Sequence, residues 1–173
     1  MKNNQDLFKL FIDELEDMYS SEHQIIESLP KLIRLASSSD LKEALTKHLH
    51  ETENQAKRLE QIFSILNLSS EEKTCEAMEG ILREAEELTE NKTKSPTLDA
   101  AIISAAQKVE HYEIASYGTL RSFAKSLELD SDIIDLLQDN LDEEGAADKK
   151  LTKIAEGSLF TTGVNKEAIK SRR

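Results

Sequence analysis

The residues of this sequence that are best suited to chemistry are acidic side chains on the apolar faces of four predicted helices. Glu22, Glu51, Glu113 and Glu144 each stand where the alternating three- and four-residue spacing calls for an apolar side chain. Each also lies within a turn of the middle of its predicted helix. Helices in a bundle lie side by side and their midpoints share one level, so we expect these carboxylates to converge on a small volume.

Three further residues extend this acidic set. Glu110 lies one turn before Glu113, and Asp148 lies one turn after Glu144, so each pair shares a helix face. His48 lies one turn before the acidic residue of its own helix. It is a candidate ligand or a hydrogen-bond donor to a ligand, and it has an alternative interpretation as an ordinary polar core histidine.

Burying these carboxylates together requires compensating positive charge or protons. One unpaired buried carboxylate costs roughly several kcal/mol, against a net domain stability of only ~5–15 kcal/mol. No Lys or Arg lies on these stripes near the acidic residues. Two divalent cations would neutralise four negative charges, and carboxylate oxygens suit iron and manganese. The sequence therefore favours two iron ions, with manganese as the alternative.

Other residues near the stripes have ordinary structural interpretations. Tyr19, Tyr112 and Tyr117 are expected to be packing residues, although one of them could bond a ligand carboxylate. Cys75 is expected to be an inert small residue. Any single glutamate on a core stripe can also be a boundary residue that reaches solvent. The sequence identifies no catalytic residue and no site for an organic cofactor.

The elements that must position the acidic residues are four long helices. A very short turn makes the first two antiparallel neighbours, and a long middle segment carrying a shorter helix, 70–88, then spans the length of the bundle. One long crossover of this kind is typical of the ferritin-like arrangement. The fold class predicted is therefore an all-α, ferritin-like four-helix bundle with a short fifth helix in its crossover. The long helices are expected at Gln5–Ala36, Leu41–Leu66, Thr97–Leu127 and Ser131–Glu156.

Helix boundaries and the domain limit follow from local signals. Residues 69–72 form a capping box ahead of the short helix, Pro96 suits the first turn of the next helix, and Gly157 suits the end of the last. The bundle is expected to occupy residues 1–160. Residues 161–173 form a polar, basic tail to which the sequence assigns no structure.

Composition narrows the class of protein further. The chain has 173 residues, enough for one domain with a substantial core, and a formal net charge of -12 disfavours nucleic acid and anionic membrane surfaces as partners. Cys75 is the only cysteine, so no internal disulfide can form and a reducing compartment fits best. No apolar run approaches the ~18 residues of a membrane span. We therefore expect a cytoplasmic protein.

Several segments together resemble one known family, the YciE/YciF family. The match extends roughly from Leu7 to Ala155, and its most specific part is the run AQKVEHYEIASYG at 106–118. That family is ferritin-like, is similar to rubrerythrin in fold, and consists of bacterial proteins linked to stress responses and often dimeric. The other matching segments are YSSE at 19–22, HLHET at 48–52, CEAMEG at 75–80, and DEE at 142–144 followed by Asp148.

The resemblance implies a di-iron carboxylate site. Its ligands by motif would be Glu22, Glu51, Glu110, Glu113 and Glu144, with Asp148 and His48 as further candidates. The Glu-x-x-His pattern usual in di-iron bundles is absent, because the third residue after each relevant glutamate is Asn54 or Ala147. This departure makes manganese a serious rival to iron. Since paired cysteines of a rubredoxin part are also missing, electrons would come from an external donor.

Three functions are consistent with these observations. The leading hypothesis is a metal-dependent redox protein of the oxidase or peroxidase type that reacts with dioxygen or peroxide in a stress response. The second is metal storage or buffering without turnover. The third is a helical interaction module without metal. A homodimer is the expected assembly.

Overall fold

A computed structural model describes residues 2–70, 73–158 and 161–170, and this part of the chain is built from α-helices. The four long helices predicted from the sequence are confirmed, with ends within about three residues of those expected. None of the helices among the described residues is long and apolar enough to span a membrane. The helices are α1 (Lys2–Leu35), α2 (Ser39–Ile65), α3 (Glu76–Thr89), α4 (Pro96–Ser126), α5 (Ser131–Glu156) and α6 (Val164–Lys170).

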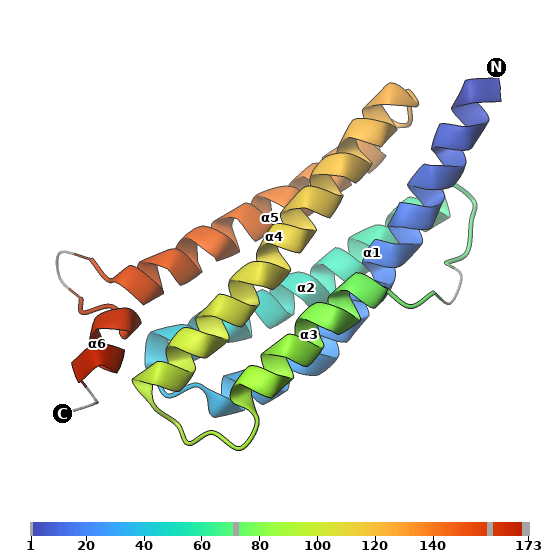
Figure 1. The fold of residues 1–173 in the computed structure, drawn as a ribbon. Helices are drawn as coiled ribbons and strands as arrows, with labels where there is room; N and C mark the ends of the chain where they lie inside the picture. The colour runs from blue at the N-terminus through green and yellow to red at the C-terminus, as the bar shows by residue number, and fades with distance from the viewer. Residues whose placement is uncertain (1, 71–72, 159–160, 171–173) are drawn as a thin grey trace.

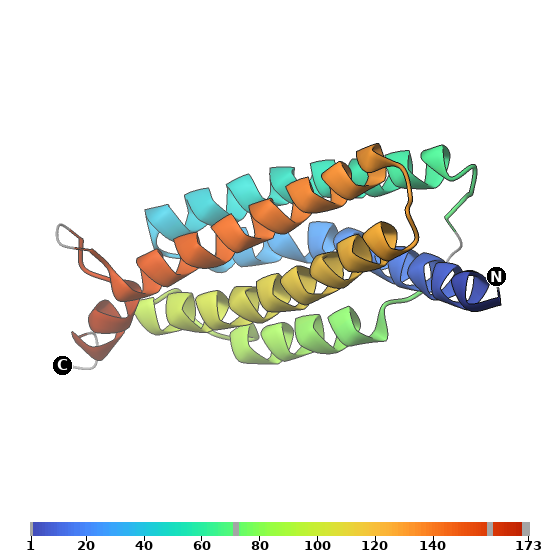
Figure 2. The ribbon, with the colours of Figure 1, turned by 90° about the horizontal axis from the view of Figure 1, so that it is seen from above.

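The long helices form two antiparallel hairpins that pack into one bundle (Figure 1). Helix α1 packs against α2, α4 packs against α5, and the hairpins meet through α1 with α4 and α2 with α5. Helix α3 lies outside this set of four, against α1 and α4, and runs the chain back along the bundle before α4 begins (Figures 1 and 2). The ferritin-like four-helix bundle with a helical crossover is therefore confirmed.

Helix ends follow the local sequence at several places. Ser95 is the N-cap of α4, its hydroxyl accepts a hydrogen bond from the Leu98 N–H at 3.2 Å, and Pro96 occupies the first turn. Gly157 ends α5 with a φ of 84°, where a Cβ would lie 2.4 Å from the nitrogen of the glycine that precedes α6. Two residues of the expected capping box at 69–72, positions 71 and 72, lie outside the described residues.

The expected start of the short helix at Ser70 is wrong, because α3 begins only at Glu76. Cys75 is its N-cap, and the Cys75 sulfur accepts a hydrogen bond from the Met78 N–H at 3.4 Å. The Cys75 N–H in turn donates to the Ser20 hydroxyl on α1 at 3.0 Å. This tertiary bond joins Cys75, whose own backbone is extended, to α1, which local capping signals did not indicate.

The sequence assigned no structure to the tail at 161–173, but α6 occupies part of it. This short helix packs against α4 and α5, and its first residue, Val164, is only 4% exposed. Gly163 permits the sharp return of the chain, since a Cβ there would lie 2.2 Å from the Glu156 backbone. A seven-residue helix with one buried apolar side chain has no periodic pattern that sequence reading could detect.

The buried face of α1 is rotated slightly from the one predicted. The three- and four-residue spacing of apolar side chains in the sequence predicts a core face, but the residues on it are only partly buried: Phe8, Ile12, Tyr19, Ile26 and Ile33. The fully buried line is Phe11, Leu15, Met18, Glu22, Ile25, Leu29 and Leu32. Helix α1 contacts α2, α3 and α4, so its apolar surface is broad and its centre cannot be fixed from spacing alone.

The apolar core is divided into two clusters by a polar layer at mid-bundle. On α1, Met18 belongs to one cluster and Ile25 to the other, and Glu22 lies between them. The same order holds on α4, where Val109 and Tyr117 flank the acidic residues. The bundle therefore interrupts its hydrophobic core at one level, the level that the acidic residues share.

Candidate metal centre

The polar layer draws one or more buried side chains from each of the four long helices. The predicted convergence at the helix midpoints is confirmed for most of the acidic set. Polar groups in a core are costly unless they are bonded or bind a ligand, so this layer is the natural candidate site. The buried polar residues of the layer are Ser21, Glu22, His48, Thr52, Gln55, Glu110, Glu113, Asn140 and Glu144.

Four of these residues bring potential metal ligands close together: His48 on α2, Glu110 and Glu113 on α4, and Glu144 on α5. Each offers one ligand atom, and these atoms all lie within 4.8 Å of one another. His48 Nε2 lies 3.5 Å from Glu110 Oε1. Metal ions of this size class bind nitrogen and oxygen at roughly 2.0–2.2 Å, which places opposite ligands about 4 Å apart. The cluster therefore has nearly the dimensions of a metal site.

Glu22 approaches the same cluster from α1. Its side chain is fully buried, and the Tyr117 hydroxyl donates a hydrogen bond to Glu22 Oε1. Burial raises the pKa of Glu22 well above its usual range, and the charge of Glu144 raises this pKa further. Such coupling requires proximity, so Glu22 and Glu144 belong to one electrostatic unit. The second oxygen of Glu22 has no hydrogen-bond partner among the described residues.

Many potential ligand atoms in this unit have no hydrogen-bond partner among the described residues. Within the described part of the chain, the atoms without one include Glu22 Oε2, Glu110 Oε2, both oxygens of Glu113, Glu144 Oε2 and both ring nitrogens of His48. A buried polar atom left unpaired costs about 1–3 kcal/mol, and more when it is charged. Cations would bond the carboxylate oxygens and one ring nitrogen of His48, while the other ring nitrogen keeps its proton. The donor set, mostly carboxylate oxygens with one imidazole, fits iron or manganese.

The acid–base behaviour of the cluster reflects its burial. Burial is the largest cause that raises the pKa values of Glu110 and Glu113 well above the usual range of a glutamate. Interaction with Glu144 is the next cause for both residues. Without cations, these carboxyl groups retain protons to higher pH than exposed glutamates do. Bound cations would displace those protons.

A hydrogen-bond network between α2 and α5 orients Glu144, and the sequence analysis did not predict it. The Gln55 amide donates to Glu144 Oε1 and, at 3.1 Å, to Glu143 Oε2. The Arg58 guanidinium donates two hydrogen bonds to the Glu143 carboxylate, of 2.7 and 2.8 Å, and a third to Asn140 Oδ1 at 2.9 Å. Gln55 follows Glu51 by four residues, so helical spacing places it on the face of His48 and Glu51, and this spacing was the available signal. No Lys or Arg was expected on the predicted stripes near the acidic residues, but Arg58, which lies off those stripes, partly offsets the raised pKa of Glu22.

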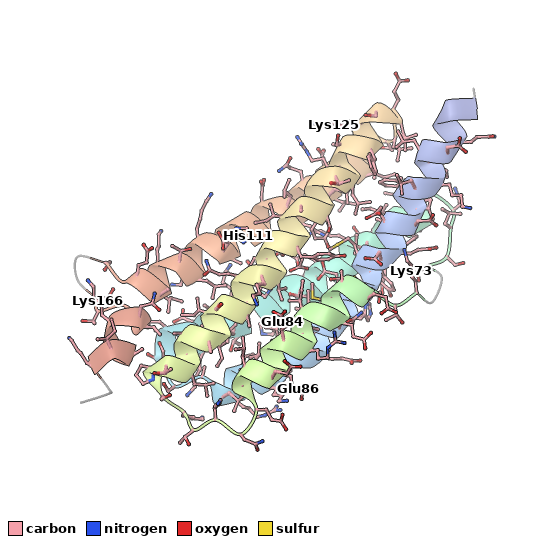
Figure 3. The ribbon with its side chains drawn as sticks, in the orientation of Figure 1. Lys73, Glu84, Glu86, His111, Lys125 and Lys166 are labelled. Atoms are coloured by element: carbon pink, nitrogen blue, oxygen red, sulfur yellow. The ribbon has the colours of Figure 1, made fainter. Side chains whose placement is uncertain are left out.

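Two predicted ligands lie outside the cluster. Glu51 forms an ion pair with Lys47 one turn earlier on α2, and its side chain remains 20% exposed at the surface of the bundle. Asp148 accepts a hydrogen bond from Gln107 at 3.0 Å and lies 3.6 Å from Nδ1 of His111, which lies on α4 (Figure 3). Both carboxylates contact polar side chains near the surface of the bundle. Their position on a helix face therefore did not determine whether the side chain points into the core or toward solvent.

Comparison with known proteins identifies relatives over nearly the whole chain. A family model described as "Domain of unknown function (DUF892)" matches residues 6–168. Protein YciF of Escherichia coli (strain K12) is 44% identical over 165 residues, which covers 95% of this chain and 99% of YciF. The resemblance to the YciE/YciF family is therefore confirmed.

Solved structures agree with this relationship. The crystal structure of the E. coli stress protein YciF matches with a TM-score of 0.81 over 85% of this chain and 92% of that one, at 44% identity. YcfI from Rhodopseudomonas palustris, also 44% identical, matches with a TM-score of 0.82 over 86% and 94% of the two chains. A Xanthomonas campestris pv. campestris protein shares the fold at 19% identity, with a TM-score of 0.66 over 86% and 89%. This chain belongs to the DUF892 family, together with YciF-like proteins.

Proposed function

We propose that this protein holds a dinuclear centre of iron or manganese in its bundle and uses it for redox chemistry with dioxygen or peroxide. The observation that carries the proposal is the buried cluster of His48, Glu110, Glu113 and Glu144, whose ligand atoms lie within 4.8 Å of one another. The E. coli relative is called a stress protein. Because this chain is 44% identical to that protein, we propose that its redox chemistry serves a stress response.

Glu22, Glu110, Glu113 and Glu144 would hold the ions, and His48 would add a neutral nitrogen ligand. Four ionised carboxylates match the charge of two divalent ions, so the loaded layer would be close to neutral in the core. When bound, such ions supply electron-transfer steps that these side chains cannot perform themselves. Full burial of most of these residues limits access of bulk water.

Neighbouring residues fix the carboxylates before any ion binds. The Tyr117 hydroxyl bonds one oxygen of Glu22 and leaves the other available. The Gln55 amide does the same for Glu144. Outer partners of this kind orient ligands and tune their basicity, so they support a preorganised site. An external electron donor and a homodimeric assembly are further parts of the proposal, taken from the family resemblance.

The competing interpretation is a helical interaction module without metal. The observation that favours it is the upward shift in the pKa values of Glu22, Glu110 and Glu113, which would let protons neutralise the layer. It predicts that chelator leaves the melting temperature unchanged and that added Mn²⁺ or Fe²⁺ does not raise it. The dinuclear interpretation predicts a higher melting temperature with either ion, because ligands that bind only the folded state stabilise it.

The redox part of the proposal is tested by peroxide consumption after reconstitution with Fe²⁺ or Mn²⁺ and a chemical reductant. The wild type should consume peroxide in a metal-dependent way, and the double variant Glu113→Gln/Glu144→Gln should not. The matched control is Glu84→Gln/Glu86→Gln, which removes the same charge from α3, where Figure 3 labels both residues. Their side chains are each 61% exposed and should be dispensable. Stoichiometric metal binding without peroxide consumption would instead indicate buffering or storage.

A further inference from the structure

Tyr112 connects the level of the proposed metal centre with the surface of α1. It directly precedes Glu113, a proposed ligand, so one peptide bond joins the two residues on α4. Its side chain packs against both apolar clusters, which lie on opposite sides of the polar layer, so its ring lies at the level of that layer. Its hydroxyl donates a hydrogen bond to Asp17 on α1 at 2.8 Å and takes no part in the proposed metal binding.

The hydrogen bonds around this hydroxyl have one direction. A tyrosine hydroxyl has a single hydrogen, and here it goes to Asp17, so the Cys75 thiol, whose sulfur lies 3.1 Å away, donates to the Tyr112 oxygen. Cys75 is fully buried, whereas the Asp17 side chain is 21% exposed and lies 3.6 Å from Lys73 Nζ. The chain of bonds therefore runs from the interior toward solvent, and a proton that leaves Tyr112 has a carboxylate to receive it.

This arrangement suits the removal of one electron from a phenol. An oxidised phenol is a far stronger acid than the phenol itself, so its hydroxyl proton leaves together with the electron. A carboxylate that already accepts the hydrogen bond receives this proton without rearrangement, as a positioned general base does. The proposed centre needs such a route for electrons, because its residues are almost fully buried and an external donor cannot touch them.

The other two tyrosines of the sequence, which contains no tryptophan, each lack one part of this arrangement. Tyr117 is fully buried, and its hydroxyl proton goes to Glu22, a carboxylate that the metal ions would use. Tyr19 donates to Glu60 near the surface, but its ring lies with the apolar cluster on one side of the polar layer. Tyr112 combines a position at the layer with a proton acceptor that reaches solvent.

We propose that Tyr112 is a redox-active residue that carries single electrons from an external donor to the proposed metal centre. Tyr112 gives one electron to an ion that peroxide has oxidised, its hydroxyl proton moves to Asp17, and a neutral phenoxyl radical remains. A one-electron reductant then gives an electron to this radical, and the proton returns from Asp17. This inference rests on the proposed function, because the metal centre and peroxide supply the oxidant.

The surface beside Asp17 is accessible to a small reductant. A cleft of about 650 Å³ lies between α1 and the segment that leads into α3, within the ~300–1,000 Å³ of typical small-molecule sites. Lys73, which pairs with Asp17 and is labelled in Figure 3, lines this cleft. A reductant in the cleft would therefore lie close to the proton acceptor of Tyr112.

The first test follows the radical by electron paramagnetic resonance in full-length protein that is loaded with Fe²⁺, mixed with hydrogen peroxide without reductant, and frozen at intervals. The wild type should show the signal of a neutral tyrosyl radical. Tyr112→Phe should bind as much iron and lose this signal, whereas the matched control Tyr19→Phe should keep it. Asp17→Asn should form the radical at least about tenfold more slowly, since the amide cannot accept the proton. Lys73→Gln removes the ion pair of Asp17 but keeps its carboxylate, and should form the radical at close to the wild-type rate.

The second test needs no metal and measures a potential. In metal-free Tyr19→Phe/Tyr117→Phe protein, whose fold is verified by circular dichroism, Tyr112 is the sole tyrosine, and voltammetry gives the potential at which it is oxidised. Adding Asp17→Asn should raise this potential, and adding Lys73→Gln should not. An unchanged potential with Asp17→Asn would overturn the proposal. If the double variant does not fold, the same comparison is made in Tyr19→Phe, where Tyr117 is fully buried.

The outcomes separate this inference from the proposed function. If the wild type binds no iron or consumes no peroxide, the proposed function fails, and the inference about Tyr112 falls with it because no oxidant remains. If the wild type does both and forms no tyrosyl radical, the inference about Tyr112 alone is overturned. A wild-type radical signal in Tyr112→Phe, or its loss in Tyr19→Phe, would also overturn the assignment to Tyr112.

Discussion

The Tyr117 hydroxyl donates a hydrogen bond to the Glu22 carboxylate across 95 positions of sequence, which joins α4 to α1 inside the polar layer. Both residues are fully buried. The bond leaves one oxygen of Glu22 available, and burial and the charge of Glu22 raise the pKa of Tyr117 well above its ordinary value. The tyrosine therefore keeps its proton and remains a hydrogen-bond donor that orients the Glu22 carboxylate.

Tyr117→Phe should lower both stability and metal affinity. Loss of the hydroxyl leaves a buried carboxylate oxygen without its donor, which costs about 1–3 kcal/mol of unfolding free energy. Metal affinity should fall by roughly 10–100-fold, the usual effect of removing an outer partner of a ligand. Urea unfolding and competition with a metal-binding dye measure the two effects.

Tyr19→Phe is the control for that variant. The Tyr19 hydroxyl donates to Glu60 at 3.0 Å near the surface, so its removal should change unfolding free energy by less than about 0.5 kcal/mol. Equal effects from Tyr117→Phe and Tyr19→Phe would contradict the role assigned to Tyr117.

Gln55→Leu should weaken metal binding more than it weakens the fold. The leucine keeps the volume and apolar contacts of the side chain but removes the amide that orients Glu144. Metal affinity should fall by roughly 10–100-fold, as measured by dye competition or by calorimetry. In the control Gln138→Leu, the lost bond is an exposed one to Asp142 at 2.7 Å, and affinity should not change. Wild-type affinity in Gln55→Leu would show that Glu144 needs no positioning.

The metal-free protein should become less stable as pH rises. Glu22, Glu110 and Glu113 have raised pKa values in the folded state, whereas an unfolded glutamate titrates near ~4.3. Above that pH the folded state holds more protons than the unfolded state, so unfolding free energy falls with pH. The stabilisation is fully present below the unfolded pKa and is lost as pH passes through the raised values.

Denaturant titrations with chelator between mildly acidic and mildly basic pH measure this slope. Glu113→Gln should flatten it, because the amide cannot ionise. Bound Mn²⁺ should abolish or reverse it, since cations hold the carboxylates in their ionised form. A chelated wild type whose stability rises steadily across this range would refute the assignment of buried, proton-holding carboxyl groups.

Cys75 should react slowly with thiol reagents in the folded protein. It is fully buried, its sulfur lies 3.1 Å from the Tyr112 hydroxyl, and burial raises the pKa of its thiol. The Tyr112 hydroxyl also donates to Asp17 at 2.8 Å, so this group is fixed between α1 and α4. Since the thiolate is the reactive form, labelling should be fast only after unfolding in urea. Rapid labelling of the native protein would contradict this placement.

Sequence patterns predicted the fold and most of the cluster because both depend on helical periodicity. Four helices with acidic residues at their midpoints must bring those residues to one level. Glu110, Glu113 and Glu144 do lie together there, and Glu22 interacts electrostatically with Glu144. His48 was a candidate ligand by its spacing from Glu51, with an ordinary polar core histidine as the alternative. The structure brings His48 into the cluster but leaves Glu51 with Lys47 near the surface.

The remaining differences arise from tertiary contacts that spacing cannot show. Residues on the edge of a helix face can turn inward or outward, and nearby Lys47 and Gln107 offer Glu51 and Asp148 partners near solvent. The late start of α3 depends on a bond from Cys75 to α1. The support of Glu144 by Gln55 joins residues 89 positions apart, and such pairings follow only from the packed bundle.

The central claim is tested most directly by elemental analysis of protein purified without chelator from cells supplied with both iron and manganese. The dinuclear proposal predicts about two metal ions per chain in the wild type and in Glu84→Gln/Glu86→Gln, and a loss of most metal in Glu113→Gln/Glu144→Gln. Identity of the bound ion would decide between iron and manganese. Wild-type protein that contains no metal, and whose melting temperature is indifferent to added Fe²⁺ or Mn²⁺, would contradict the claim and favour the metal-free helical module.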